Sequence, residues 1–471
     1  MKLTVVCIDG LGSSTLDLLN LKRLSKRMHG GKIFNPTIRN VVSRGWPEIY
    51  TGQTAYENGS FYQSPKVSND KIYATQNTGY GKLIADNPRL QTLWDQLSSM
   101  GLSVGVFTVP TVPVLNKISG FSVGATGGGN FGNNLDTGQI YPLNLFNKSE
   151  IHNVDLGLRM GFGGFIPNNI AHLSAYGEKH LNDYFKLLNL ALKRQPTDVT
   201  LIGTRFINEM GYKFIGLFTK QKLSQKESDL KNVVLSLCEK FDRHLDDFLN
   251  QNTIEHTFIV SDHGIGPFKY EINLNEYLYS LNYISKIRGK YNWKVLLHPI
   301  YRKKVEFFTN TKMSFPFPKY DLNNSKAFSI GFTNVIYLND QRFTGVAYSA
   351  SEREKLLNSL TNDLNKRSID FERKAAVRFE RIDDKITASN GPDILCRLPA
   401  GVANTERRFD VLYKVNPNYG DMFQSGFHGE YSGCKSEDTL SAYSGNCMGV
   451  EINDLTDTLN QVIRVARNEF Q

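Results

Sequence analysis

The chain has 471 residues with a net charge of +9, and 40% of its residues are hydrophobic, 21% charged and 11% aromatic. This composition excludes a disordered tail, a collagen-like fibre and a small disulfide scaffold, and the length suffices for one large domain or two to three ordinary ones. No apolar run approaches the roughly 18 residues of a membrane span. Five scattered cysteines and an N-terminus typical of a buried strand rather than a signal peptide predict a cytoplasmic protein.

Short apolar runs alternate with helical patterns along the chain. In chain order, the runs predict strands at Leu3–Ile8, Leu102–Val109, Val199–Ile202, Thr257–Val260, Val335–Leu338 and Ile394–Leu398. The 3.6-residue patterns predict helices at Leu93–Met100, Glu178–Arg194, Ser228–Asn250, Ser351–Lys366 and Asp454–Arg464. Continuous apolar strands with helices between them are typical of a parallel sheet covered on both faces, so the predicted fold class is α/β.

Polar side chains follow two of these strands directly. Asp9 comes after the first strand, and Asp262 and His263 come after the strand that ends at Val260. Ligands of open parallel sheets bind beyond the carboxyl ends of the strands, and carboxylates with an imidazole suit a divalent metal such as Zn²⁺ or Mn²⁺. Asp9-Gly10 alone fits a strand-ending turn equally well. Asp262 and His263 indicate function more strongly than Asp9 does, because two adjacent polar groups are costly to bury.

A third segment, Ser43 to Gly52, predicts a helix with Pro47 in its first turn. A hydroxyl at a helix N-terminus lies where backbone N–H groups favour an anion. If the Ser43 hydroxyl also touches a metal, its pKa falls and it can attack phosphorus. The alternative is that Ser43 only caps the helix.

Seven blocks of sequence, in this order, resemble the alkaline phosphatase superfamily, and within it the type I phosphodiesterase/nucleotide pyrophosphatase group, especially its phosphohydrolase/phosphomutase branch. They are Val5–Gly10, Ser43–Gly52, Val109–Pro113 with Gly120–Val123, Val260–Pro267 with Asn273–Asn275, Asp321–Asn339, Gly391–Ile394 and Gly426–Gly429. The resemblance implies a three-layer sandwich around a mostly parallel sheet. Residues 1–285 and 320–471 would form this domain, and residues 286–319 would be a basic, aromatic insertion.

The resemblance also implies a metal-dependent hydrolase of phosphomonoesters or phosphodiesters. Its nucleophile would be Ser43, and one metal would be held by Ser43 together with Asp9, Asp262 and His263. Zinc is the first expectation for this metal, with manganese or magnesium as alternatives. Arg44 is expected to contact the phosphoryl oxygens, or else to be a surface helix charge.

A second metal would use His428 with an Asp and a His that follow a middle strand, and this chain has Asn208 and Tyr212 at those positions. A neutral amide is a poor ligand for a transition metal, so we expect one tight metal and assign Asn208 to the phosphoryl oxygens. Asn208 and Tyr212 also fit an alternative function, in which the chain is a catalytically weakened relative of these enzymes that binds a phosphate-bearing ligand or partner.

Nearly all the excess charge lies in residues 286–319, which carry nine Lys or Arg and one Glu with aromatic residues between them. This pattern fits docking to an anionic membrane surface or to a lipid-linked substrate. It also fits single-stranded nucleic acid, or a subdomain with an aromatic core and a solvated basic face. Because the rest of the chain is almost neutral, nucleic acid is not the expected partner. The predicted partner is a small phosphate ester or a lipid-linked substrate, with peripheral membrane contact through residues 286–319.

Overall fold

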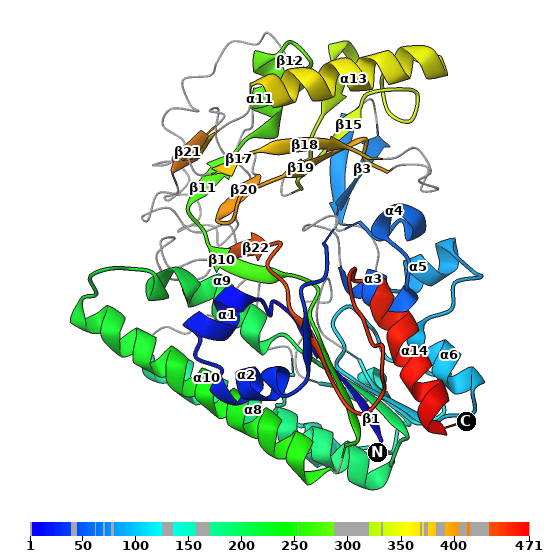
Figure 1. The fold of residues 1–471 in the computed structure, drawn as a ribbon, viewed down its shortest axis with the longest axis vertical. Coiled ribbons are helices and arrows are strands. Elements are labelled where there is room, and N and C mark those ends of the chain that lie inside the picture. Colours follow the sequence, from blue (N-terminus) through cyan, green and yellow to red (C-terminus); the bar gives the residue numbers. More distant parts are fainter. Residues whose placement is uncertain are drawn as a thin grey trace.

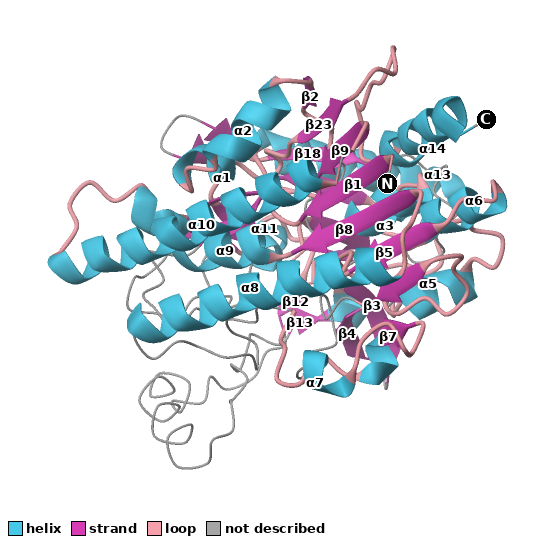
Figure 2. Ribbon diagram, turned by 90° about the horizontal axis from the view of Figure 1, so that it is seen from below, coloured by secondary structure: helices cyan, strands magenta, loops and turns pink. Residues whose placement is uncertain are grey.

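The computed structural model describes residues 2–38, 45–61, 63–68, 71–76, 80–124, 135–156, 170–252, 254–286, 320–330, 333–367, 370–371, 375–382, 391–404, 412–414 and 433–470. Its largest sheet has the strand order β2 (Lys32–Phe34), β23 (Ser441–Ser444), β9 (His256–Val260), β1 (Leu3–Ile8), β8 (Val199–Thr204), β5 (Val104–Phe107), β6 (Phe121–Val123) and β7 (Ile140–Tyr141). Figure 1 labels β1 in the lower half of the view, and Figure 2 labels most of the other strands of this sheet in their order. From β9 to β6 every neighbouring pair is parallel. Antiparallel pairs are found toward the two edges. The predicted α/β class with a mostly parallel sheet is therefore confirmed.

Strand β1 explains why an uninterrupted apolar run is needed in the middle of the sheet. Val6 and Ile8 join a core beneath α8 (Ile170–Arg194), α9 (Phe206–Phe218) and α10 (Gln225–Gln251). Val5 and Cys7 join a second core on the other face, beneath α3 (Gly45–Thr51), α6 (Leu93–Ser99) and α14 (Asp457–Phe470). Successive side chains of a strand point to opposite faces, so both faces must be apolar. Figure 2 shows the two sets of helices on opposite sides of the sheet, which makes three layers.

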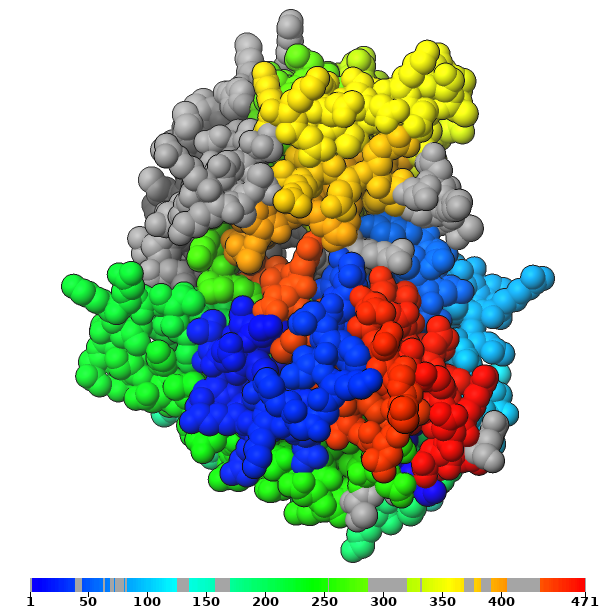
Figure 3. All heavy atoms as spheres, in the orientation of Figure 1, coloured from blue at the N-terminus to red at the C-terminus, as the bar shows by residue number. Residues whose placement is uncertain are grey.

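The predicted helices are present with shifted ends. Helix α8 begins at Ile170 rather than Glu178, and α14 spans Asp457–Phe470 rather than Asp454–Arg464. The late start of α14 has a local cause, because the Asp457 carboxylate accepts hydrogen bonds from the backbone N–H groups of Asn453 and Asp454, both at 2.9 Å. Figure 3 shows the N-terminal and C-terminal parts of the chain side by side on one face, where β2 pairs with β23.

A second, antiparallel sheet consists of β14 (Ala327–Phe328), β15 (Val335–Leu338), β19 (Ile394–Arg397) and β18 (Arg378–Arg381). It shares a separate apolar core with α11 (Leu274–Ser280) and α13 (Ala350–Lys366). The apolar runs at Val335–Leu338 and Ile394–Leu398 are strands as predicted, but they belong to this sheet and not to the parallel one. A short apolar run predicts a buried strand, but burial alone does not determine which sheet that strand joins.

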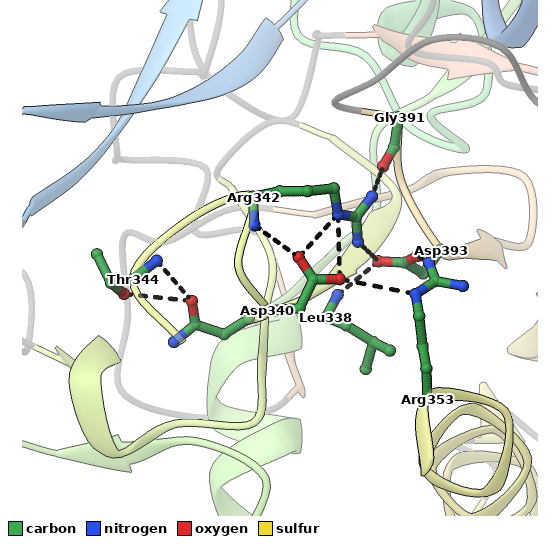
Figure 4. Close-up of polar contacts among 8 residues, drawn as sticks. Leu338, Asp340, Arg342, Thr344, Arg353, Gly391 and Asp393 are labelled. Atoms are coloured by element: carbon green, nitrogen blue, oxygen red, sulfur yellow. Dashed lines mark hydrogen bonds and ion pairs between the residues drawn. The ribbon is translucent and has the colours of Figure 1, made fainter. Parts of the chain in front are cut away.

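Four charged side chains join the end of β15, the start of β19 and α13 (Figure 4). Arg342 donates to Asp340 Oδ1 at 2.9 Å and to Asp393 Oδ2 at 2.8 Å. Arg353 donates to the other oxygen of Asp393, and its Nε lies 3.6 Å from Asp340 Oδ2. Both carboxylates are buried, and two arginines balance their charges. The network therefore acts as a buried, charge-balanced tie within this second sheet.

The ends of the basic segment lie next to each other. Strands β12 (Ser285–Lys286) and β13 (Tyr320–Asp321) pair antiparallel, with Lys286 opposite Tyr320. Residues 287–319 lie outside the described residues, so the division of the chain into a domain and an insertion stays a prediction. In the part of the chain that the structure describes, no helix is both long enough and apolar enough to cross a membrane.

Candidate metal centre

Three neighbouring strands end at the same level of the sheet. The register pairs Ile8 of β1 with Thr204 of β8, and Cys7 of β1 with Val260 of β9. Continuing the same register past the strand ends places Asp9 level with Arg205 on one side and with Asp262 on the other. Because these strands are parallel, their carboxyl ends meet at one edge. The edge where ligands bind in such sheets therefore carries two carboxylates and a guanidinium.

Asp9, Asp262 and His263 converge at this edge, as three of the predicted metal ligands. His263 Nε2 lies 3.3 Å from Asp9 Oδ1 and 3.6 Å from Asp262 Oδ2. His263 Nδ1 lies 2.8 Å from the carbonyl oxygen of Gly264, which assigns the proton to Nδ1 in the neutral ring. The lone pair of Nε2 then faces two carboxylate oxygens, and either a proton or a metal cation is required among these atoms.

The surrounding backbone holds the three side chains in place. The hydroxyl of Ser261 accepts a hydrogen bond from the backbone N–H of Leu11 and donates one to the carbonyl of His263, both at 2.9 Å. Gly10 has a φ of +82°, and a Cβ on it would lie 3.0 Å from the Cα of Asn208. The turn after Asp9 therefore needs glycine, for its left-handed backbone and for the close approach of α9.

The two carboxylates experience opposite electrostatic effects. Burial alone would raise the pKa of Asp9, but its contact with His263 and the charges of Arg205 and Lys435 outweigh burial and lower it. Burial and the neighbouring Asp9 charge raise the pKa of Asp262. Asp262 Oδ1 is also buried without a hydrogen-bond partner among the described residues. A bound cation would satisfy this oxygen and offset the repulsion between the two carboxylates.

Asn208 lies at the same centre, in the first turn of α9 rather than in an extension of the strand. With the amide oriented to satisfy both neighbours, its nitrogen donates to Asp9 Oδ1 at 3.2 Å and its oxygen accepts from Arg205 Nη2 at 3.1 Å. Tyr212 follows one turn later, and its ring centroid lies 6.3 Å from that of His263. The structure thus places Asn208 and Tyr212, which depart from the pattern that the resemblance implies, beside two of the predicted ligands.

Arg205 is the residue that sequence reasoning missed. Its Nε lies 3.4 Å from Asp9 Oδ2, and its Nη2 lies 3.3 Å from Glu209 Oε1. Burial would lower the pKa of Arg205, but the Glu209 and Asp9 carboxylates outweigh burial and raise it. The available signal was its position directly after the apolar run Val199–Thr204, which matches the position of Asp9 after Leu3–Ile8. A search for metal-ligand residue types alone passes over an arginine at such a position.

The predicted residues Ser43, Arg44 and His428 lie outside the described residues. The first described residue after Ser43 and Arg44 is Gly45, where α3 begins. A Cβ on Gly45 would lie 2.9 Å from both the Cβ and the carbonyl oxygen of Asp262. The chain therefore enters α3 in direct contact with a predicted metal ligand, while the roles of Ser43, Arg44 and His428 stay predictions.

Comparison with known proteins finds no matching family model and no matching curated protein. Several solved structures align along the chain. Phosphonoacetate hydrolase from Sinorhizobium meliloti 1021, in complex with phosphonoformate, has 12% identity and a TM-score of 0.47 over 99% of this chain and 96% of its own. Murine ectonucleotide pyrophosphatase/phosphodiesterase 5 has 11% identity and a TM-score of 0.45, and the human protein has 12% and 0.44, each over 99% of this chain and 95% of its own. At these values the likenesses assign neither an activity nor a substrate.

Proposed function

We propose that the chain is a metal-dependent hydrolase of phosphoric esters, in which Asp9, Asp262 and His263 hold one divalent cation and Ser43 is the nucleophile. The observation that carries this proposal is the convergence of three buried ligand atoms within 4.8 Å of one another. One of the two carboxylates also keeps a buried oxygen without a hydrogen-bond partner among the described residues. The reaction class comes from the sequence motifs, which resemble phosphohydrolases and phosphodiesterases.

The donor set fits the proposed ion. Two carboxylates and one imidazole are ligands that suit Zn²⁺ first, with Mn²⁺ or Mg²⁺ as alternatives, and three protein ligands leave coordination positions for a hydroxyl and a substrate oxygen. When bound, a dication polarises a phosphoryl oxygen and lowers the pKa of a hydroxyl that it contacts. The protein's own groups orient the ligands, since Gly264 fixes the tautomer of His263, and Asn208 and Arg205 hold Asp9.

The charge around the centre favours an anionic, phosphate-bearing small molecule as substrate. Arg205 contacts Asp9 directly, and Lys435 on β22 (Gly433–Ser436) acts on Asp9 and Asp262 at longer range. Together with a bound dication, these two cations outweigh the carboxylates of Asp9, Asp262 and Glu209, so the loaded site attracts anions and stabilises charge on a phosphoryl group. Arg44 is proposed to add a third cation, and His428 to be what remains of a second metal site. Lipid-linked substrates, membrane contact through residues 286–319 and a cytoplasmic location stay predictions.

The test measures hydrolysis of an aryl phosphate and an aryl phosphodiester with Zn²⁺, Mn²⁺ or Mg²⁺. We expect turnover that needs the metal and that falls about 100-fold or more in Ser43→Ala, because the nucleophile is lost. Ser99→Ala, at the exposed end of α6, is the matched control and should keep wild-type turnover. Unchanged turnover in Ser43→Ala would refute the proposed nucleophile, and a chain that binds no metal would refute the proposed function.

The second candidate is a binding protein that retains the site without efficient turnover. Asn208 favours the binding protein, because a neutral amide that bonds to Asp9 and Arg205 stands where the resemblance implies a charged metal ligand. The same assays separate the two candidates. A chain that binds metal and inorganic phosphate but hydrolyses neither ester would be the binding protein.

A further inference from the structure

Asp9 divides its two carboxylate oxygens between different partners. Oδ1 faces His263 Nε2 at 3.3 Å, on the side of the proposed metal. Oδ2 faces the guanidinium of Arg205, whose Nε lies at 3.4 Å. Since the register puts Asp9 and Arg205 at the ends of paired strands, the backbone of the sheet sets this contact. The metal side and the guanidinium side of Asp9 are therefore built into the fold.

The guanidinium is held from several directions, with part of it left accessible. Glu209 Oε1 lies 3.3 Å from Nη2, and the Asn208 oxygen lies 3.1 Å from the same nitrogen. Together with Asp9, these groups restrain the side chain, which is 24% exposed. The second terminal nitrogen, Nη1, has no partner in the described part of the chain. A guanidinium carries five N–H donors, so its accessible edge can still donate to an oxygen of a ligand.

A second divalent ion on the Oδ2 side of Asp9 would lie against this fixed positive charge. Asn208, at the position where the resemblance implies a metal-binding Asp, is neutral and offers such an ion no carboxylate ligand. We propose that Arg205 is the permanent second cation of the site, so that the site takes a single divalent ion and the accessible edge of Arg205 binds a phosphoryl oxygen of the substrate. This inference rests on the proposed function. Arginine suits the role because its planar donors match phosphate oxygens and its charge does not depend on pH.

The experiment measures two quantities on the full chain. Elemental mass spectrometry gives the number of metal ions bound per chain, and calorimetry gives the affinity of the metal-loaded protein for inorganic phosphate. We expect one ion per wild-type chain. Arg205→Gln should keep that ion and bind inorganic phosphate about tenfold more weakly or worse, since a charged hydrogen-bond donor is lost. Arg205→Lys should recover part of the affinity. Arg194→Gln is the control, because Arg194 has a similar exposure and pairs with Glu150 away from the site.

Each outcome has a defined meaning. Two ions per wild-type chain, or phosphate affinity of Arg205→Gln within twofold of wild type, would overturn this inference and leave the proposed function standing. No bound ion would overturn both. Asn208→Asp supplies a carboxylate and retains Arg205, and we expect it still to bind one ion, because the guanidinium stays against Asp9 Oδ2, where the second ion would lie. Two ions in Asn208→Asp would overturn the exclusion of a second metal even if Arg205→Gln failed to fold.

Discussion

Replacing Asp262 by Asn should stabilise the metal-free protein and abolish its response to metal. Asp9 and Asp262 present carboxylate oxygens within 4.8 Å of each other, and the Asp262 side chain is only 3% exposed. At that separation, an effective dielectric constant of about 20 gives a repulsion of roughly 3 kcal/mol. The neutral amide removes the repulsion and loses the attraction to His263, so we expect a net gain of about 1–3 kcal/mol without metal.

The sign of the pH dependence follows from the raised pKa of Asp262, whose ordinary value is 3.8. A carboxyl group that ionises less readily in the folded state destabilises that state at high pH and has no such effect below its unfolded pKa. The advantage of Asp262→Asn should therefore be present at pH 7 to 8 in chelator and disappear as the pH falls toward about 4. Near neutral pH the gain corresponds to a rise in Tm of roughly 1–3 °C for a chain of this length.

The assay is thermal unfolding with and without Zn²⁺ or Mn²⁺. At 100 times Kd, metal should stabilise the wild type by about 2.7 kcal/mol, and this gain should vanish in Asp262→Asn. Asp242→Asn is the matched control. Asp242 is also buried with a pKa raised by burial, but its oxygens accept the backbone N–H groups of Arg23 and Leu24 at 2.7 and 2.8 Å. It should lose stability and keep the metal response. A lower Tm of Asp262→Asn in chelator, or a preserved metal response, would show that Asp262 is not an uncompensated ligand.

Three further predictions use the same unfolding and metal-binding measurements. Gly45→Ala should destabilise the folded protein by about 1–3 kcal/mol and weaken metal binding, because the new Cβ would press on Asp262. Gly30→Ala is the control: a Cβ there has more room, and metal affinity should change less than twofold. Ser261→Ala should cost about 1–2 kcal/mol and also weaken metal binding, since it removes the tie between the loops after β1 and β9; wild-type affinity in this variant would contradict that role. Asp393→Asn should cost about 2–3 kcal/mol in urea unfolding, because Asp340 alone would then face two partly buried arginines, and metal affinity should not change. A shift in that affinity would connect the second sheet to the site.

The sequence was sufficient to predict features that depend on local burial. Leu3–Ile8 is apolar throughout because both faces of β1 are covered, and this pattern is visible without knowing the neighbours. A polar group placed directly after such a run lies at a sheet edge, which is why Asp9, Asp262 and His263 could be selected in advance. Helix existence could also be predicted, and helix ends less well, because side-chain contacts such as those of Asp457 decide where a helix starts.

Only the tertiary structure decided which strands are neighbours. The runs Val335–Leu338 and Ile394–Leu398 look like those of the central sheet, yet they pair antiparallel in another one. The pairing of β8 with β1 brings Arg205 to Asp9, and α9 then turns Asn208 back onto the same carboxylate. The residues next to a given residue in the sequence predict whether it is buried and where the chain turns. The charge that faces Asp9 comes from a strand far along the chain, and that pairing is settled by the packing of the whole sheet and its two helical layers.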